Sequence, residues 1–435
     1  MSELNTAISP PMDITGYKSI SSVKVSRVSI QPENKTDLAL TGSNTSDVYF
    51  AIGSRPNSFL NGSNSYLSFT YTLEGTTPTV GSSVGISNGT GASFIRTLET
   101  IAGSTSLELI NDYAPLACLV DDFQNGSRSK TLGTILEDKS SSAVKKSIDR
   151  PTATSGDAGF TQKRRICIPL MSVALGTLQD KYMPMGQDLG MRLRITFEAP
   201  DIALMCGATE PAVLGYKLED ISFECEYLEC ESQTYNAIVQ ESGGVMKVSG
   251  TGVASFQTTV SAGSTSNTLL IPARFSSVRN MMTICRSNLS INTKKGNSQG
   301  ARTRDNMASY VYRIHGKNYP NLEVPADNFT SAEVMCELLK CFHSLHNTTQ
   351  SIAFDATNWV DSVEASLTSA FAIGIDFEEP AFSSSQMSGL STNDGNTFLV
   401  LKHSAPCVAS TYNTYCFYDT IIEIDTRSGE VMVSR

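Results

Sequence analysis

The sequence predicts an all-β protein with a few short helices, organised as two consecutive antiparallel β-sandwiches. Two central segments, Met191–Glu198 and Ile221–Leu228, alternate apolar and polar residues along their length. Because side chains alternate across a strand, this pattern is typical of half-buried antiparallel sheet. The chain has 435 residues, which suits two domains rather than one. A similar order of strands and helices occurs in both halves, which indicates two domains of similar build.

The first half contains further strand signals and one short helix. We expect strands at Val23–Ile30, Ser65–Glu74, Phe94–Ile101, Ser106–Asn111 and Ile166–Val173. The composition of Ala102–Thr105 predicts a hairpin turn between two of these strands. A helix is expected at Ala114–Phe123, and a polar stretch from Gln124 to Gln162 carries a second candidate helix at Thr134–Ile148.

The second half repeats this order. Its strands are expected at Ala254–Val260, Thr268–Ile271, Val278–Cys285, Tyr310–His315, Phe371–Phe377, Phe398–Leu401, Tyr418–Ile424 and Val431–Val433. The segment Ser331–His346 has a helical apolar stripe, and Thr330-Ser331-Ala332-Glu333 before it has the form of a capping box. The helices near Ala114 and Ser331 therefore correspond, as do the strands near Ile221 and Ile421. Many short strands separated by turn signals favour a sandwich or jelly roll.

These patterns predict four segments. Residues 1–20 are polar, contain Pro10-Pro11 and are expected to form a flexible arm. Residues 21–232 form the first β-domain, 233–250 a connector and 251–435 the second β-domain.

The composition argues for a protein that is covered by neighbours. Only 17% of residues are charged, against about 25% in an average soluble domain, and Ser, Thr, Asn and Gly are abundant. Interfaces are depleted in Lys and Glu, so this usage suits surfaces that become buried in an assembly. The net charge of −10 argues against sequence-specific nucleic-acid binding, because a nucleic-acid binder needs a basic footprint. Basic groups such as Lys163-Arg164-Arg165 are interpreted as solvated loops.

Targeting and redox signals are weak. The N-terminus has no basic start followed by an apolar run, so we expect no signal peptide. The apolar stretches are too short to span a bilayer. Ten dispersed Cys without a CxxC pair predict reduced thiols. Sequons such as Asn328-Phe329-Thr330 are interpreted as chance matches in a chain rich in Asn, Ser and Thr.

The sequence contains no convincing catalytic or metal-binding motif, so we expect no enzyme activity, no catalytic, cofactor-binding or metal residues, and no cofactor. Gly81-Ser82-Ser83-Val84-Gly85 matches GxSxG but lies in a polar loop, whereas the hydrolase motif needs a strand before Ser83 and a helix after it. Cys336, Cys341, His343 and His346 crowd one segment, but their spacing lacks the tight pairs of zinc sites, so both Cys are expected to fill the core. The scarce His residues, including His315, select no catalytic arrangement. The acidic run Glu219–Glu231 is interpreted as a solvated strand face or a subunit contact.

The order of elements resembles that of double jelly-roll major capsid proteins of the adenovirus, virophage and Polinton-like virus group. The resemblance rests on Asn64–Leu73, Phe94–Leu109 with Asn111-Asp112-Tyr113, Ile166–Tyr182, Met191–Phe197, the segment from Tyr312 to Pro320, and the strand pair within Tyr418–Val433. It covers most of residues 20–435. The chain is shorter than many family members, which leaves little room for large outer insertions.

The resemblance implies two consecutive eight-stranded antiparallel jelly rolls and a structural, non-enzymatic protein. It implies a homotrimer that forms a pseudo-hexameric capsomer and packs with neighbouring capsomers into an icosahedral virion capsid, together with penton and minor capsid proteins. Family members differ in whether they enclose a membrane, and the sequence leaves this open. Polar strand faces bearing Arg192, Arg194, Glu224 and Glu226 become candidates for barrel-to-barrel contacts.

Two alternatives remain, in addition to a hydrolase that would use Ser83. The first is a single jelly-roll capsid protein with a projecting β-domain, against which the second helix and the symmetric lengths count. The second is a two-domain carbohydrate-binding β-sandwich, which would favour exposed aromatic clusters, although the chain has only one Trp, Trp359.

Overall fold

The computed structural model describes residues 23–75, 84–87, 91–124, 136, 163–178, 182–186, 189–206, 213–291, 294, 298–327, 331–342, 359, 370–378, 388–426 and 428–435. The arm expected at residues 1–20 lies outside these ranges, and so does the helix expected at Thr134–Ile148, apart from Leu136. Within the described ranges, no helix has both the length and the apolar character that a transbilayer segment requires.

The first half of the chain folds into two facing antiparallel sheets. One sheet has the order β1 (Val23–Ile30), β12 (Leu214–Cys230), β4 (Ser58–Gly75) and β8 (Arg164–Pro169), with β2 (Leu38–Thr41) added beside β12 and β9 (Met183–Pro184) beside β4. The other has the order β3 (Ser46–Ile52), β10 (Met191–Phe197), β6 (Ile95–Ala102) and β7 (Thr105–Ile110). A small ribbon joins β5 (Val84–Ile86) to β11 (Leu204–Cys206).

The second half contains an equivalent pair of sheets. The first has the order β13 (Val245–Val260), β20 (Ser410–Asp425), β15 (Val278–Ser287) and β18 (Ile373–Asp376), with β21 (Val431–Ser434) beside β20. The second has the order β14 (Ser266–Ile271), β19 (Thr397–His403), β16 (Met307–Ile314) and β17 (Lys317–Pro325).

The two halves share one topology. If the main strands of each half are numbered along the chain, each half has one sheet in the order 1-8-3-6 and one in the order 2-7-4-5. This is the jelly-roll arrangement. Helices α2 (Tyr113–Gln124) and α7 (Ser331–Cys341) both follow the fifth main strand of their half and precede the sixth. The predicted double jelly roll, and the predicted correspondence of these helices and of the eighth strands, are therefore confirmed. We call the two units the first and second barrel.

Several elements differ from the sequence prediction. Strands β3 and β17 were not expected from the sequence, although Val48, Phe50 and Ile52 of β3 alternate inward. The segment predicted as connector contains helix α5 (Ser232–Glu241) and the start of β13 at Val245. The helix is amphipathic rather than merely polar. Its buried Tyr235 packs against Phe59, with ring centroids 5.5 Å apart. The remaining short helices are η2 (Gly91–Phe94), α4 (Pro200–Ala203) and α6 (Asn288–Ile291).

Each barrel is filled by the inward faces of its sheets. In the first barrel the ring of Phe69 lies 5.8 Å from those of Phe94 and Phe197, in edge-on contacts. In the second barrel Tyr310 and Tyr312 are similarly edge-on at 6.2 Å. Burying one such ring contributes about 1.5–3 kcal/mol, and aromatic pairing adds about 0.5–1.5 kcal/mol. The main apolar cluster continues from the first barrel into the second, and a smaller separate cluster surrounds Tyr235 of α5.

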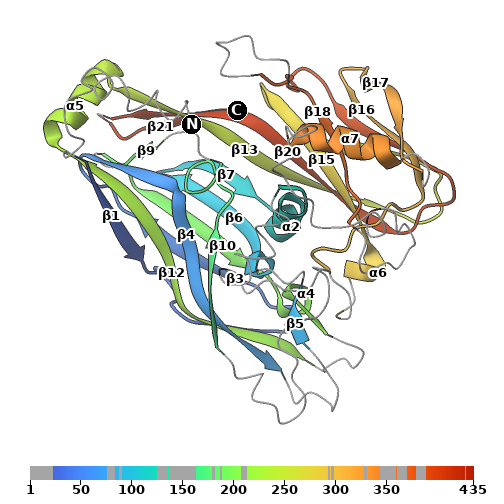
Figure 1. Ribbon diagram of the computed structural model, residues 1–435, viewed down its shortest axis with the longest axis horizontal. Helices are drawn as coiled ribbons and strands as arrows, with labels where there is room; N and C mark the ends of the chain where they lie inside the picture. Colours follow the sequence, from blue (N-terminus) through green and yellow to red (C-terminus); the bar gives the residue numbers. More distant parts are fainter. Residues whose placement is uncertain are drawn as a thin grey trace.

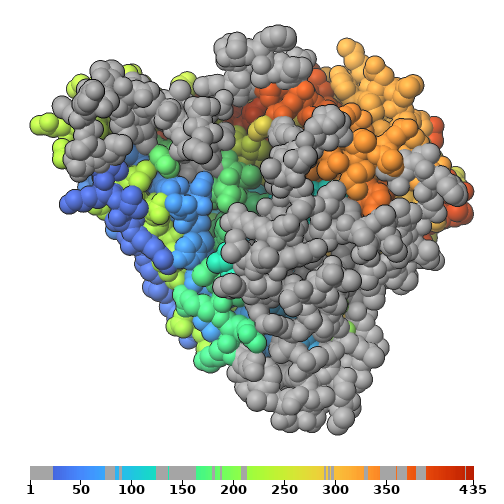
Figure 2. Space-filling model, in the orientation of Figure 1, coloured from blue at the N-terminus to red at the C-terminus, as the bar shows by residue number. Residues whose placement is uncertain are grey.

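The barrels lie side by side, with α2 between them (Figure 1). Strands β1 and β12 lie on the far side of the first barrel, and α7 and β17 lie on the far side of the second (Figure 1). In the space-filling view the blue residues of the first barrel and the orange residues of the second occupy opposite ends of the visible face (Figure 2). In this view α5 and the β1–β12 side lie at one end of the chain, and α7 and β17 lie towards the other (Figure 1).

Candidate functional site

The GxSxG segment lacks the local structure of a hydrolase elbow. Strand β5 begins at Val84, so a strand follows Ser83 where the motif needs a helix. Ser83 itself lies outside the described residues.

The two Cys of the Cys and His cluster near α7 lie in different environments. Cys341 is buried as predicted, and burial raises the pKa of its thiol well above the ordinary value. The expectation that Cys336 fills the core was wrong, because the helix buries Val334 and Leu338 and leaves Cys336 exposed. His343 and His346 lie outside the described residues. All ten Cys are free thiols, in agreement with the sequence prediction.

The acidic residues of β12 are matched by partners on neighbouring strands of the first barrel. Glu224 pairs with Arg27 at 3.2 Å and accepts a hydrogen bond from Ser29 at 2.8 Å. Burial alone would raise the pKa of Glu224, but hydrogen bonds from Ser29 and Ser222 and the charge of Arg27 bring it below the ordinary value. Glu226 accepts hydrogen bonds from Asn61 and from a second Asn side chain, both at 2.7 Å. This face is a network of cross-strand pairs rather than a cation site.

The polar face of β10 is likewise paired inside the first barrel. Arg194 contacts Asp47 at 2.9 Å and Glu99 at 3.2 Å, while Arg192 contacts Glu33 at 3.2 Å. Arg194 also lines a polar cleft of about 540 Å³ whose lining includes Ser255 and Gln257 of the second barrel. Of the residues proposed for barrel contacts, Arg194 therefore faces the neighbouring barrel of the same chain.

The contact between barrels is centred on the corner that leads from β7 into α2. The N–H of Asn111 donates to Ser255 Oγ at 3.1 Å. Asp112 has a positive φ of 49°, and this turn aims both its carboxylate and its carbonyl at β20. Asn413 Nδ2 donates to the carboxylate at 2.7 Å, and the hydroxyl of Tyr415 donates to the carbonyl at 3.1 Å. These bonds fix the corner on the outer face of the second barrel's β13–β20 pair.

A buried ion pair and stacked rings continue this contact along α2. Asp122 pairs with Arg302, and their side chains are only 3% and 1% exposed. The next residue, Phe123, stacks on Phe342 with centroids 5.4 Å apart and planes 12° apart. Trp359 lies edge-on to the same ring at 6.0 Å. The first barrel thus inserts a charged and an aromatic side chain into the second.

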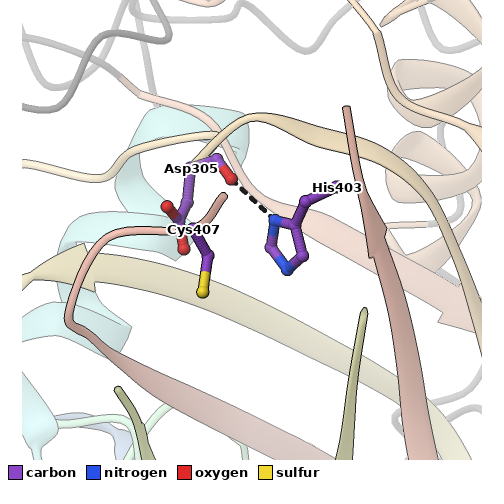
Figure 3. Close-up of side chains that lie close together, drawn as sticks. All are labelled: Asp305, His403 and Cys407. Carbon is purple, nitrogen blue, oxygen red and sulfur yellow. Dashed lines mark hydrogen bonds between the residues drawn. The ribbon is translucent and has the colours of Figure 1, made fainter. Parts of the chain in front are cut away.

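A separate polar cluster lies within the second barrel, where Asp305, His403 and Cys407 converge (Figure 3). Their potential ligand atoms all lie within 4.8 Å of one another. Burial raises the pKa of Asp305, although hydrogen bonds from the Val408 N–H and the Tyr412 hydroxyl oppose this shift. The sequence analysis did not identify this cluster, because 98 residues separate Asp305 from His403, although Cys407 follows His403 by only four residues.

The junction residues were also missed by the sequence analysis. Asp112 and Asn413 are polar residues at positions that an isolated strand or turn would leave in solvent. Only the topology brings the β7–α2 corner to β20. One signal was present: the eighth strand of the second half contains Asn413-Thr414-Tyr415-Cys416-Phe417, which lacks the polar alternation of Ile221–Leu228.

No protein-family model matches the sequence, and no curated protein matches it. Solved structures do match. PBCV-1 VP54, as fitted into a reconstruction of the virophage Sputnik, is 11% identical with a TM-score of 0.59, over 97% of this chain and 98% of that one. The Faustovirus major capsid protein is 8% identical with a TM-score of 0.57, over 94% and 91%. A Sputnik virophage structure is 9% identical with a TM-score of 0.54, over 98% and 92%. The chain therefore has, over nearly its whole length, the fold of these double jelly-roll capsid proteins.

Proposed function

We propose that this chain is a structural major capsid protein that trimerises into a pseudo-hexameric capsomer and builds an icosahedral shell. The observation that carries the proposal is the likeness in fold over nearly the full length of both chains, with two barrels of one topology side by side. Three such chains supply six similar barrels, which is the number that a six-sided tile needs.

The contact inside one chain supports a specific mode of association. It joins the corner after the fifth strand of the first barrel to the outer face of the first and eighth strands of the second. Two equivalent surfaces take no part in this internal contact. They are the β17–α7 side of the second barrel and the outer face of β1 and β12 in the first. They lie at opposite ends of the chain (Figure 1). A head-to-tail contact between copies would repeat the internal one, and such heterologous contacts form a closed ring when the rotation closes.

The alternatives are less well supported. A projecting domain of different build does not fit a second half with the same strand order as the first. A carbohydrate-binding sandwich would favour exposed aromatic rings, yet Trp359 is buried, and the large exposed apolar side chains among the described residues are aliphatic. The fold and the sequence together favour a role without catalysis or sequence-specific nucleic-acid binding. We extend the proposal to residence in the virion and to contacts with penton and minor capsid proteins.

Mass measurement and imaging of the purified full chain test this proposal. We expect light scattering after size-exclusion chromatography to give the mass of three chains, and negative-stain electron microscopy to show particles with a hexagonal outline. A protein that stays monomeric up to its solubility limit, across a range of salt concentrations, would contradict it.

A further inference from the structure

The Asp305, His403 and Cys407 cluster brings together three side chains of the kinds that bind transition metals. Asp305 precedes β16, His403 ends β19, and Cys407 lies in the loop that leads to β20. All three are buried, with exposed fractions of 2%, 7% and 2%. Figure 3 shows the carboxylate, the imidazole and the thiol around one common space. Carboxylate, imidazole and thiolate are all established zinc ligands.

His403 has the orientation that is typical of a metal-ligating histidine. His403 Nδ1 lies 2.7 Å from the backbone carbonyl oxygen of Asp305. Because a carbonyl can only accept, Nδ1 carries the proton, and Nε2 then presents a lone pair to the cluster. Ligating histidines almost always donate their other ring N–H to a carbonyl or carboxylate in this way.

The side chain of Asn267 lies close to both His403 Nε2 and Cys407 Sγ. Its Nδ2 lies 3.1 Å from His403 Nε2 and 3.7 Å from Cys407 Sγ. Tetrahedral zinc, with bonds of about 2.0 Å to N or O and about 2.3 Å to S, separates its ligand atoms by about 3.3 Å for N and O and about 3.5 Å for S and O. The amide group therefore stands at ligand spacing from both atoms. Rotation of the amide presents its oxygen, a fourth ligand, at the same point.

The other two ligands are also held in place. Asp305 accepts hydrogen bonds from the Val408 N–H at 2.8 Å and the Tyr412 hydroxyl at 3.1 Å, one on each carboxylate oxygen. Each oxygen keeps a second lone pair for a cation. The Cys407 thiol lies 3.4 Å from the carbonyl oxygen of Ser261 and donates to it. A cation would replace that proton, which would leave for solvent as the thiolate binds.

We propose that Asp305, His403, Cys407 and Asn267 form a zinc site that ties together the loops at one end of the second barrel. The proposal goes beyond the capsid role, because it concerns the stability of one barrel whatever the chain assembles into. Thiolate and imidazole ligands favour Zn²⁺ over Mg²⁺ or Ca²⁺, which prefer oxygen. The site joins the start of β14, the segment before β16, the end of β19 and the β19–β20 loop, so bound zinc would hold these parts of the barrel in one position.

Metal analysis of the folded full chain tests the site. Purified protein is incubated with Zn²⁺, dialysed and analysed by mass spectrometry of the metal, and a parallel sample is loaded with Co²⁺. We expect about one Zn²⁺ per chain, and for Co²⁺ a thiolate-to-cobalt charge-transfer band with the intense visible absorption of tetrahedral coordination. Cys407→Ser should abolish the charge-transfer band, and His403→Gln should weaken Zn²⁺ binding at least tenfold. Cys336→Ser and His315→Gln are matched controls that should leave both readouts unchanged.

Two outcomes would overturn the zinc site. One is folded wild-type protein with less than about a tenth of a zinc ion per chain and no cobalt band, a result that needs no variant to fold. The other is zinc retained equally by Cys407→Ser and His403→Gln, both checked for native circular dichroism. Mass measurements on the same samples report trimer formation separately, so the failure of this site and the failure of the capsid proposal are distinguishable.

Discussion

The outer faces of the two equivalent sheets have different surroundings, although their strand order is the same. In the second barrel every residue of β20 from Ser410 to Thr420 is buried, because the first barrel covers the sheet's outer face. In the first barrel the equivalent strand β12 keeps half-buried or exposed positions such as Lys217, Asp220 and Glu226. One topology therefore supports both a sheet that is covered on two sides and a sheet with one open side. The open side is the one that the capsid proposal assigns to a neighbouring copy.

The same contrast separates the ion pairs of the two faces. Asp122 and Arg302 lie in the covered junction, and two nitrogen atoms of Arg302, Nε and Nη1, have no hydrogen-bond partner among the described residues. Arg27 and Glu224 lie on the open face, where the Arg27 side chain is 61% exposed. A buried charge that loses its partner is costly, whereas an exposed pair contributes little.

The largest expected effect is therefore at the junction. Asp122→Ala removes the partner of a buried guanidinium and should lower the free energy of unfolding by about 3–5 kcal/mol. Urea unfolding monitored by tryptophan fluorescence measures this change, since Trp359 lies against the neighbouring Phe123.

The double variant Asp122→Leu/Arg302→Met is the control for this prediction. It removes both charges at similar volume, and such replacements are often neutral or stabilising. Recovery of most of the lost stability would attribute the loss to the unpaired charge. A loss below about 1 kcal/mol in Asp122→Ala would show that the pair is solvated and that the junction opens in solution.

Regular alternation of apolar and polar residues decided how much of each strand the sequence predicted. A strand with one wet face alternates, so Met191–Glu198 was assigned with nearly correct bounds. The segment Ile221–Leu228 covers only the later part of β12, which begins at Leu214 and whose pairing with β4 shifts register between Glu219 and Ser222. Strand β20 is buried on both faces and does not alternate, so only its last part was assigned. Strand β17 has an irregular pattern and was missed, although the turn His315-Gly316 that precedes it has the two positive φ values of a type I′ hairpin.

The candidate sites were less predictable for a different reason. Asp305 and His403 meet through a backbone carbonyl, and Asp112 meets Asn413 across two barrels. Neither contact leaves a local spacing in the sequence. The Cys and His near α7 did have a local spacing, but the helix turns Cys336 towards solvent. Proximity along the chain was therefore a poor guide, and topology decided which side chains meet.

An effect of intermediate size is expected in the fifth strands of the two barrels, because the pKa values of their carboxylates are shifted in opposite directions. Glu108 of β7 is fully buried, and burial raises its pKa despite hydrogen bonds from Thr100 and the Val173 N–H. Its stabilising contribution is complete below its unfolded pKa of about 4.3 and is lost as pH rises through the folded pKa. Between these values the unfolding free energy should fall by up to about 1.4 kcal/mol per pH unit, and Glu108→Gln should remove that fall.

Glu323 of β17 is the matched control for Glu108. Hydrogen bonds from Lys402 and Ser309 lower its pKa. Its stabilising contribution is therefore present above the unfolded pKa and is lost as pH falls through the folded pKa. Glu323→Gln should change the pH slope of the unfolding free energy only slightly, and in the direction opposite to the change caused by Glu108→Gln. Urea titrations of the three proteins between pH 4 and pH 8 compare these slopes. Identical pH slopes for wild type and Glu108→Gln would contradict the prediction.

The smallest expected effect on stability is on the open face of the first barrel. Arg27→Ala removes the exposed cation of the pair, while the buried Glu224 keeps its hydrogen bond from Ser29, so the free energy of unfolding should change by about 0–1 kcal/mol. If β1 and β12 contact a neighbouring copy, however, Arg27→Ala should weaken the association of the subunits, because charged contacts become desolvated in an interface. We therefore expect a nearly unchanged unfolding curve at low protein concentration together with a weaker trimer, measured by sedimentation equilibrium.

Lys247 of β13 provides the comparison for Arg27. It pairs with Glu423 at 2.6 Å and its side chain is 60% exposed, so it matches Arg27 in exposure while lying on the second barrel. Lys247→Ala should leave both the unfolding curve and the association constant unchanged, since the head-to-tail contact uses the first strand of the first barrel and not that of the second. Equal weakening of the trimer by both substitutions would show that net charge governs association. Weakening by Lys247→Ala alone would place the subunit contact on the β13 side and overturn the proposed ring.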